Sequence, residues 1–130
     1  MRLLPFTALV ALAVPALAQR PRVPVPISNA EPMACSTARM VMLRRSRDLF
    51  AVRAGPSRRE RVLVILRERD PVYACVRRGG WFGIVFPDRR RPVDCGVQVR
   101  WRAARSYRGP CRSGWVHYDH IGGYADWISP

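Results

Sequence analysis

After Asp48 the chain alternates between short apolar runs and clusters of turn-forming or charged residues. Residues 49–57 alternate apolar and polar side chains and break at a Gly-Pro pair, and residues 61–70 form a β-branched apolar run that ends in charges. Residues 71–80 alternate again and stop at Gly-Gly, and residues 81–86 are hydrophobic up to Pro-Asp. Runs of this length, bounded by glycine, proline and aspartate, predict short β-strands.

The remaining segments extend this pattern without adding a long helix. Residues 33–47 are ambiguous between strand and helical spacing, and we favour a strand from Arg39 to Arg44. Residues 113–129 predict a short strand, a turn and a last strand. Within 71–80, alternation predicts one face that carries Val72, Ala74 and Val76. Short strands in quick succession predict an all-β fold, either a small barrel or a sandwich.

The N-terminal 18 residues have the features of a signal peptide. A basic start precedes an apolar stretch, and small residues at Ala16 and Ala18 form the pattern that signal peptidase accepts. We expect cleavage after Ala18 and a periplasmic or secreted mature protein. An uncleaved anchor is the alternative, but the apolar stretch is short for a bilayer span.

Proline then dominates the segment that follows. Four prolines between residues 19 and 32 resist helix formation and predict an extended tether. We therefore divide the mature chain into a proline-rich tether and N-terminal segment, residues 19–38, and one folded domain, residues 39–130. A proline-rich ligand for another protein is a second, less favoured interpretation of the same residues.

Four cysteines in a small exported domain predict two disulfides. Zinc is the competing interpretation, but the cysteine spacings contain no C-x-x-C pair, so no metal site is expected. Three pairings are possible. We favour Cys95 with Cys111, because the segment between them has the character of an insertion that needs closing, and Cys35 with Cys75 then follows by elimination.

The charge of the chain is strongly positive. Its 23 basic residues are all arginine, and against 9 acidic residues they give a formal net charge of +14. Arginines intermixed with aromatic residues, as around Trp101, are typical of surfaces that bind polyanions. The basic surface is expected at Arg89, Arg90, Arg91, Arg100 and Arg102. The absence of lysine also fits a GC-rich genome, so part of this charge reflects base composition.

Four fragments in a fixed order make the chain similar to a known family. The runs LFAVRAGPS, RVLVILRERDPVYACV, GGWFGIVF and SGWVHYDHI resemble the bacterial Src-homology-3-like (SH3-like) domain, over about residues 48–121. The residues that carry the resemblance are Leu49, Val52, Arg53, Gly55, Pro56, Gly80, Trp81, Val85, Gly114, Trp115 and Val116. The resemblance implies a small five-stranded SH3-like barrel. The departures are Phe50, where a polar residue is usual, and the stretch 87–112, which becomes an extended hairpin insertion.

The resemblance also implies a place for a ligand. In related eukaryotic domains the tryptophan at the Trp81 position lines the ligand groove, and His117 and His120 occupy positions that supply a proline and a tyrosine there. The expected groove consists of Trp81, Phe82, His117, Tyr118 and His120, with Arg89 to Arg91 and Trp101 contributed by the insertion. The competing interpretation is that Trp81 and Trp115 only close a small core.

No arrangement of residues predicts catalysis or a cofactor. His117 and His120 flank Asp119 and could offer two imidazoles to a metal or a proton-transfer step, but two histidines without further ligands rarely do so. We therefore expect a non-enzymatic binding module for cell-wall peptide or an envelope protein. The main alternative is an electrostatic adaptor for anionic envelope polymers or nucleic acid. A small envelope enzyme or toxin that uses the two histidines, and a purely structural accessory, are further possibilities.

Overall fold

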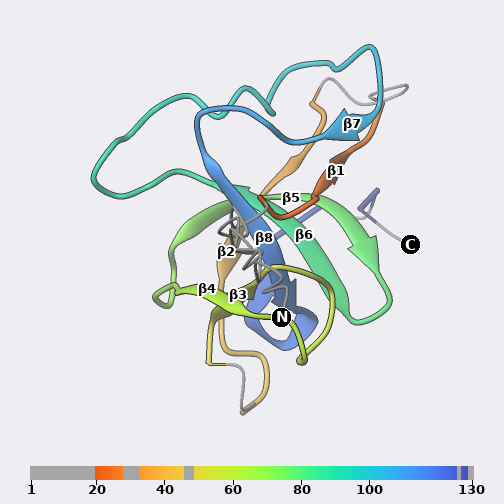
Figure 1. Cartoon of the computed structure of the whole chain (residues 1–130). Coiled ribbons are helices and arrows are strands. Elements are labelled where there is room, and N and C mark those ends of the chain that lie inside the picture. The colour runs from red at the N-terminus through yellow and green to blue at the C-terminus, as the bar shows by residue number, and fades with distance from the viewer. Residues whose placement is uncertain (1–19, 28–32, 46–48, 126, 129–130) are drawn as a thin grey trace, which may run out of the picture.

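The computed structural model describes residues 20–27, 33–45, 49–125 and 127–128. Within these ranges the secondary structure consists of nine β-strands and one 3-10 helix, with no α-helix (Figure 1). The prediction of an all-β fold is thereby confirmed. The predicted signal peptide, residues 1–18, lies outside the described residues.

Seven strands form one antiparallel sheet in the order β4-β3-β8-β6-β5-β2-β9. Their bounds are Ser36–Met40 for β2, Ala51–Arg53 for β3, Val62–Ile65 for β4, Pro71–Arg78 for β5, Trp81–Phe86 for β6, Arg112–His117 for β8 and Ile121–Gly122 for β9. The two longest pairings join β5 to β6 and β6 to β8, so the two strands predicted within residues 71–86 pair with each other at the centre of the sheet. The 3-10 helix η1, Tyr118–His120, connects β8 to β9.

The strand β2 lies earlier in the chain than predicted. We expected Arg39 to Arg44, whereas β2 ends at Met40. Its alternation buries Ser36, Ala38 and Met40 and leaves the residues between them exposed. The burial of this face against the sheet decides the register, because a one-residue slip would expose all three side chains.

Both faces of the sheet carry a hydrophobic cluster. The inner cluster contains Phe82, Ile84 and Val116, and the outer cluster contains Val85 and Trp115. Successive side chains of a strand point to opposite faces, so β6 contributes to both clusters in turn. A strand that is buried on both sides is apolar throughout, which is the composition of residues 81–86.

A β-bulge in β5 changes the face of one predicted core residue. Ala74 pairs with Ile84 and Val76 pairs with Gly83, so Cys75 and Val76 together oppose one residue of β6. The extra residue reverses the alternation, as bulges do. Val76 therefore packs against the outer cluster, and the prediction that it shares a face with Ala74 is wrong.

The proline-rich segment is extended as predicted, but its described residues pack against the domain and do not form a free tether. Its strand β1, Pro24–Val25, pairs with β7, Arg105–Ser106, of the insertion (Figure 1). Val23 and Val25 are fully buried in the outer cluster. Valine between the prolines makes this docking favourable, because burying each such side chain contributes about 1.5–3 kcal/mol.

Two disulfides stabilise the outer layer of the molecule. Cys35 is bonded to Cys75 and Cys95 to Cys111, which are the two predicted pairs. All four cysteines belong to the outer cluster, where the insertion covers the sheet. Disulfides of this kind indicate an oxidising, non-cytoplasmic compartment.

A buried tyrosine joins the two ends of the insertion, and its removal gives a first prediction. The hydroxyl of Tyr107 donates to the carbonyl of Cys95 at 2.8 Å and accepts the N–H of Cys111 at 3.1 Å. Tyr107→Phe leaves both backbone groups without this partner. We expect a loss of about 1–3 kcal/mol in the free energy of unfolding, measured by urea denaturation at pH 7.

The same variant should change the pH dependence of stability. Burial raises the pKa of Tyr107 above its ordinary value of 10.0. The contribution of the protonated Tyr107 hydroxyl to the free energy of unfolding is therefore complete below pH 10. It is lost as the pH rises through the raised pKa. Tyr107→Phe should lose less stability than the wild type between neutral and strongly alkaline pH, and equal losses in the two proteins would contradict this.

Candidate ligand-binding surface

Three of the predicted groove residues come together at one end of the outer sheet face. Trp81 and His117 are paired across β6 and β8, and their rings meet edge to face with centroids 5.2 Å apart. The ring of Tyr118 follows at 4.6 Å from that of His117. Trp81 and His117 are half-buried and Tyr118 is 38% exposed. We call these three residues the aromatic patch.

The turn between β5 and β6 supports this patch. Gly79 has a φ of 57°, in the left-handed region that favours glycine. At Gly80 a Cβ atom would lie 3.3 Å from Cδ1 of Tyr118, and the backbone N–H of Tyr118 donates to the carbonyl of Gly80 at 2.9 Å. The tyrosine ring therefore packs directly on the backbone of the turn, which sets its position beside His117.

His117 is held by the helical turn that follows it. Its Nδ1 accepts the backbone N–H of Asp119 at 3.3 Å and lies 3.3 Å from Oδ2 of the same residue. A neutral imidazole caps η1 through Nδ1 and leaves Nε2 as its donor, whereas a protonated imidazole would pair with the carboxylate.

The other two predicted groove residues lie in the interior. Phe82 has no exposed surface and packs on Tyr124, with ring centroids 4.6 Å apart. His120 is 1% exposed and its ring contacts Phe50 at 5.1 Å. Phe82 follows Trp81 directly in β6, so alternation turns it to the opposite face. Neither side chain offers a surface to a ligand, and the expected five-residue groove is reduced to the aromatic patch.

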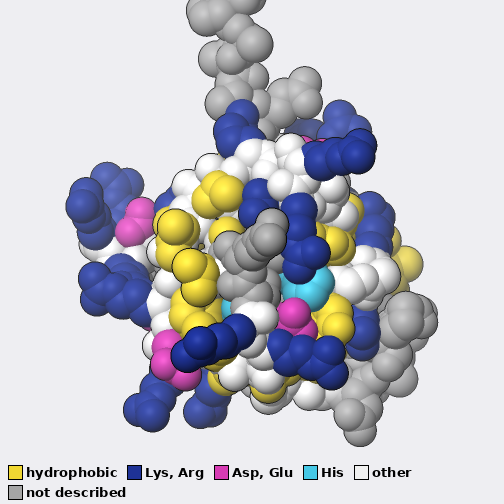
Figure 2. All heavy atoms as spheres, turned by 90° about the horizontal axis from the view of Figure 1, so that it is seen from below, with side chains coloured by type: hydrophobic (Ala, Val, Ile, Leu, Met, Phe, Trp, Pro, Cys, Tyr) yellow, Lys and Arg dark blue, Asp and Glu magenta, His cyan; other side chains and the backbone are white. Residues whose placement is uncertain are grey.

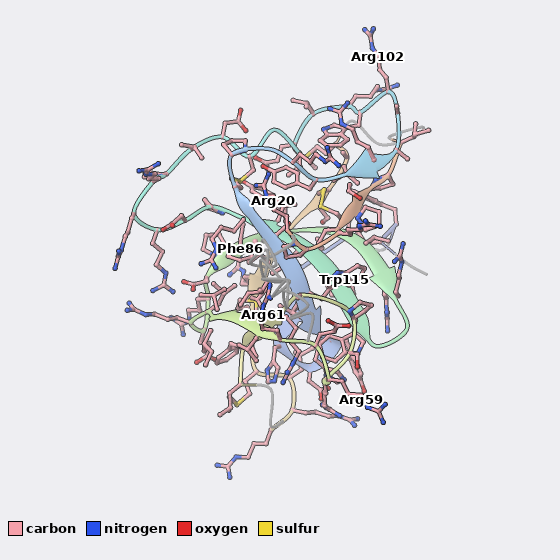
Figure 3. The ribbon with its side chains drawn as sticks, viewed as in Figure 1. Arg20, Arg59, Arg61, Phe86, Arg102 and Trp115 are labelled. Carbon is pink, nitrogen blue, oxygen red and sulfur yellow. A yellow bond between two sulfur atoms is a disulfide. The ribbon has the colours of Figure 1, made fainter. Side chains whose placement is uncertain are left out.

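The predicted basic residues lie on the insertion. Arg89 forms an ion pair with Asp70, and Arg91 is bridged to Asp88 in a tight turn. Arg90, Arg100 and Arg102 are exposed. Figure 3 places Arg102 at the outer tip of the insertion, far from Trp115. The ring of Trp101 is half-buried and stacks under Arg105, with the guanidinium carbon 4.6 Å from the ring centroid.

A basic hollow that the sequence did not predict opens on the same outer face. This pocket, with a volume of about 370 Å³, is lined by Arg20, Pro21, Arg22, Ala54, Gly55, Pro56, Glu60, Arg61, Arg78 and Trp115. We call it the arginine cleft. Trp115 pairs with Gly83, two residues along β6 from Trp81, so the cleft and the aromatic patch share one face of the sheet. Its arginines are spread over the sequence, and among so many arginines no local signal distinguishes them.

No family model matches the chain, and neither a curated protein nor a solved structure matches it. In the described part of the chain, no helix is long and apolar enough to cross a membrane. The same residues contain no group of three or more histidine, cysteine, aspartate or glutamate side chains placed to hold a metal ion.

Proposed function

We propose that the chain is an exported, non-catalytic binding module of the bacterial SH3-like class, which recognises cell-wall peptide or an envelope protein. The observation that carries the proposal is the aromatic patch, where Trp81 remains accessible beside His117 and Tyr118. Rigid aromatic side chains of this kind supply much of the binding energy in recognition sites.

Two further features support this class. The Gly-Trp-Val run of β8 is followed directly by the short helix η1, which is the order that the resemblance implies. The sheet also contains antiparallel pairings between strands that are consecutive in the chain, β3 with β4 and β5 with β6. The two disulfides agree with a periplasmic or secreted location, which the predicted signal peptide would provide.

The test is retention of the oxidised protein on purified peptidoglycan at low salt and at about 0.5 M salt, where exposed charges are screened. We expect the wild type to be retained at both concentrations and Trp81→Ala to bind about tenfold more weakly or worse. Trp127→Ala is the matched control, because it removes a half-buried tryptophan that packs against the inner cluster and lies outside the expected groove. Equal binding by wild type and Trp81→Ala would contradict the proposal.

The alternative function is an electrostatic adaptor for anionic envelope polymers or nucleic acid. Figure 2 shows a face on which arginine side chains surround the apolar patches and outnumber the acidic side chains. Binding through such a surface falls steeply with salt. Loss of retention at high salt, with no effect of Trp81→Ala, would favour this adaptor over the aromatic patch.

A further inference from the structure

We propose that the arginine cleft is a discrete binding site for a single oxyanion, a carboxylate or phosphate group carried by an otherwise uncharged ligand. The site is distinct from the aromatic patch, and the inference does not depend on what that patch binds. It follows from the charge of the lining residues, from the way in which they are held, and from the apolar walls between them.

The charge of the cleft is not balanced within the protein. Four arginines line it against one glutamate, Glu60. Among the described residues, none of these four arginines forms an ion pair with a carboxylate. Cations gathered around one hollow repel each other, and the low dielectric of the protein wall increases that repulsion. A bound anion would offset this repulsion between the arginine side chains.

Arg20 is held in position by neutral partners. Its guanidinium donates to the carbonyls of Gly109 at 3.0 Å, Arg108 at 3.3 Å and Cys111 at 3.4 Å. Carbonyl oxygens orient the group without neutralising its charge. A guanidinium has five N–H donors, so this arrangement leaves donors for a ligand. The docking of β1 on β7 brings Arg20 and Arg22 to the cleft.

Arg78 is positioned by a cation–π contact. Its guanidinium carbon lies 5.5 Å from the ring centroid of Trp115, which also lines the cleft. This contact holds the positive charge at the cleft without neutralising it, and the aromatic ring does not use the N–H donors of the guanidinium. A guanidinium can bind carboxylate or phosphate oxygens through pairs of such donors.

The remaining walls are apolar or closely packed. Pro21, Pro56 and Ala54 separate the cations. Glu60 packs on Gly55, another wall residue, where an added Cβ would lie 2.9 Å from its side-chain carbons, so its carboxylate is held against this wall of the cleft. Figure 3 shows Arg20, Arg61 and Trp115 around the same part of the sheet. A volume of about 370 Å³ is within the range of pockets for small ligands.

The test is a titration of the oxidised, full-length protein at constant ionic strength, followed by the NMR signal of the Trp115 indole N–H. Inorganic phosphate and acetate are the two probes. We expect saturable shifts in the wild type, and an affinity at least tenfold lower in the double variant Arg22→Gln/Arg61→Gln. Both side chains line the cleft and are exposed, so the fold should be retained.

Arg100→Gln/Arg102→Gln is the matched control, with the same loss of charge on the insertion. It should bind each probe as the wild type does. Binding of phosphate alone would identify a phosphate-bearing ligand, and binding of acetate alone a carboxylate-bearing one; either result supports the site. Equal weakening in both double variants, or no saturable shift at Trp115, would overturn the proposal.

Discussion

Phe82→Ala should lower the free energy of unfolding by about 3–5 kcal/mol, the usual cost of emptying a phenylalanine site in a core. Phe82 is fully buried in the inner cluster, with Tyr124 against one side and the guanidinium of Arg77 5.3 Å from its ring centroid. The central place of β6 in the sheet leaves little freedom for neighbouring strands to fill the cavity. Urea denaturation of the oxidised protein measures the loss.

Trp81→Ala is the informative comparison. The two residues are adjacent in β6, but Trp81 is half-buried at the open end of the outer face. Trp81→Ala should lower the free energy of unfolding clearly less than Phe82→Ala does. It should weaken ligand binding more. If the two variants were equally destabilised, or if Phe82→Ala remained as stable as the wild type, the assignment of Phe82 to the core would be wrong.

The second large effect concerns the disulfide between Cys35 and Cys75. Replacing both residues by alanine should destabilise the protein by about 4 kcal/mol, because their separation of 40 residues gives the unfolded chain much conformational freedom when the bond is absent. The replaced side chains also leave space in the buried outer cluster. Thermal unfolding monitored by circular dichroism provides the measurement.

The bond between Cys95 and Cys111 offers an internal control. It closes only 16 residues, so the same replacement there should cost about 3 kcal/mol. Its removal should loosen the insertion, which proteolysis can detect, while the sheet remains folded. A larger loss of stability from this pair than from Cys35 and Cys75 would contradict the ranking by loop length.

The central strands could be predicted from local pattern, but their faces could not. Residues 71–80 and 81–86 are bounded by clear turn signals, and β5 and β6 lie within them. Because both faces of β6 are covered, its sequence is apolar at every position and does not show which residues face inward. The resemblance predicts Phe82 in a groove with Trp81, and nothing in this apolar run shows that Phe82 faces the inner cluster. The bulge beside Cys75 likewise has no signal in the sequence.

Long-range packing accounts for the other differences. The prolines correctly predict that the segment is extended. The pairing of Pro24 with Ser106 could not be predicted in the same way, because it depends on a partner far along the chain. The arginine cleft is assembled from that segment, the connection between β3 and β4, and the end of β5. The composition of the chain shows that the protein is basic, but it does not show which arginines lie together. Only the tertiary arrangement separates Arg22 and Arg61, which line a hollow, from Arg102 at the tip of the insertion.

The place of β2 in the sheet affects the order in which the chain can fold. This strand lies between β5 and β9, and Arg39 pairs with Gly122. A chain that emerges from its N-terminal end therefore cannot pair both edges of β2 until almost all of it has been synthesised. Such distant pairings carry a high loop-closure cost and slow folding. Until then one edge of β2 has unpaired backbone N–H and C=O groups, and we expect the incomplete chain to be most prone to association through this edge.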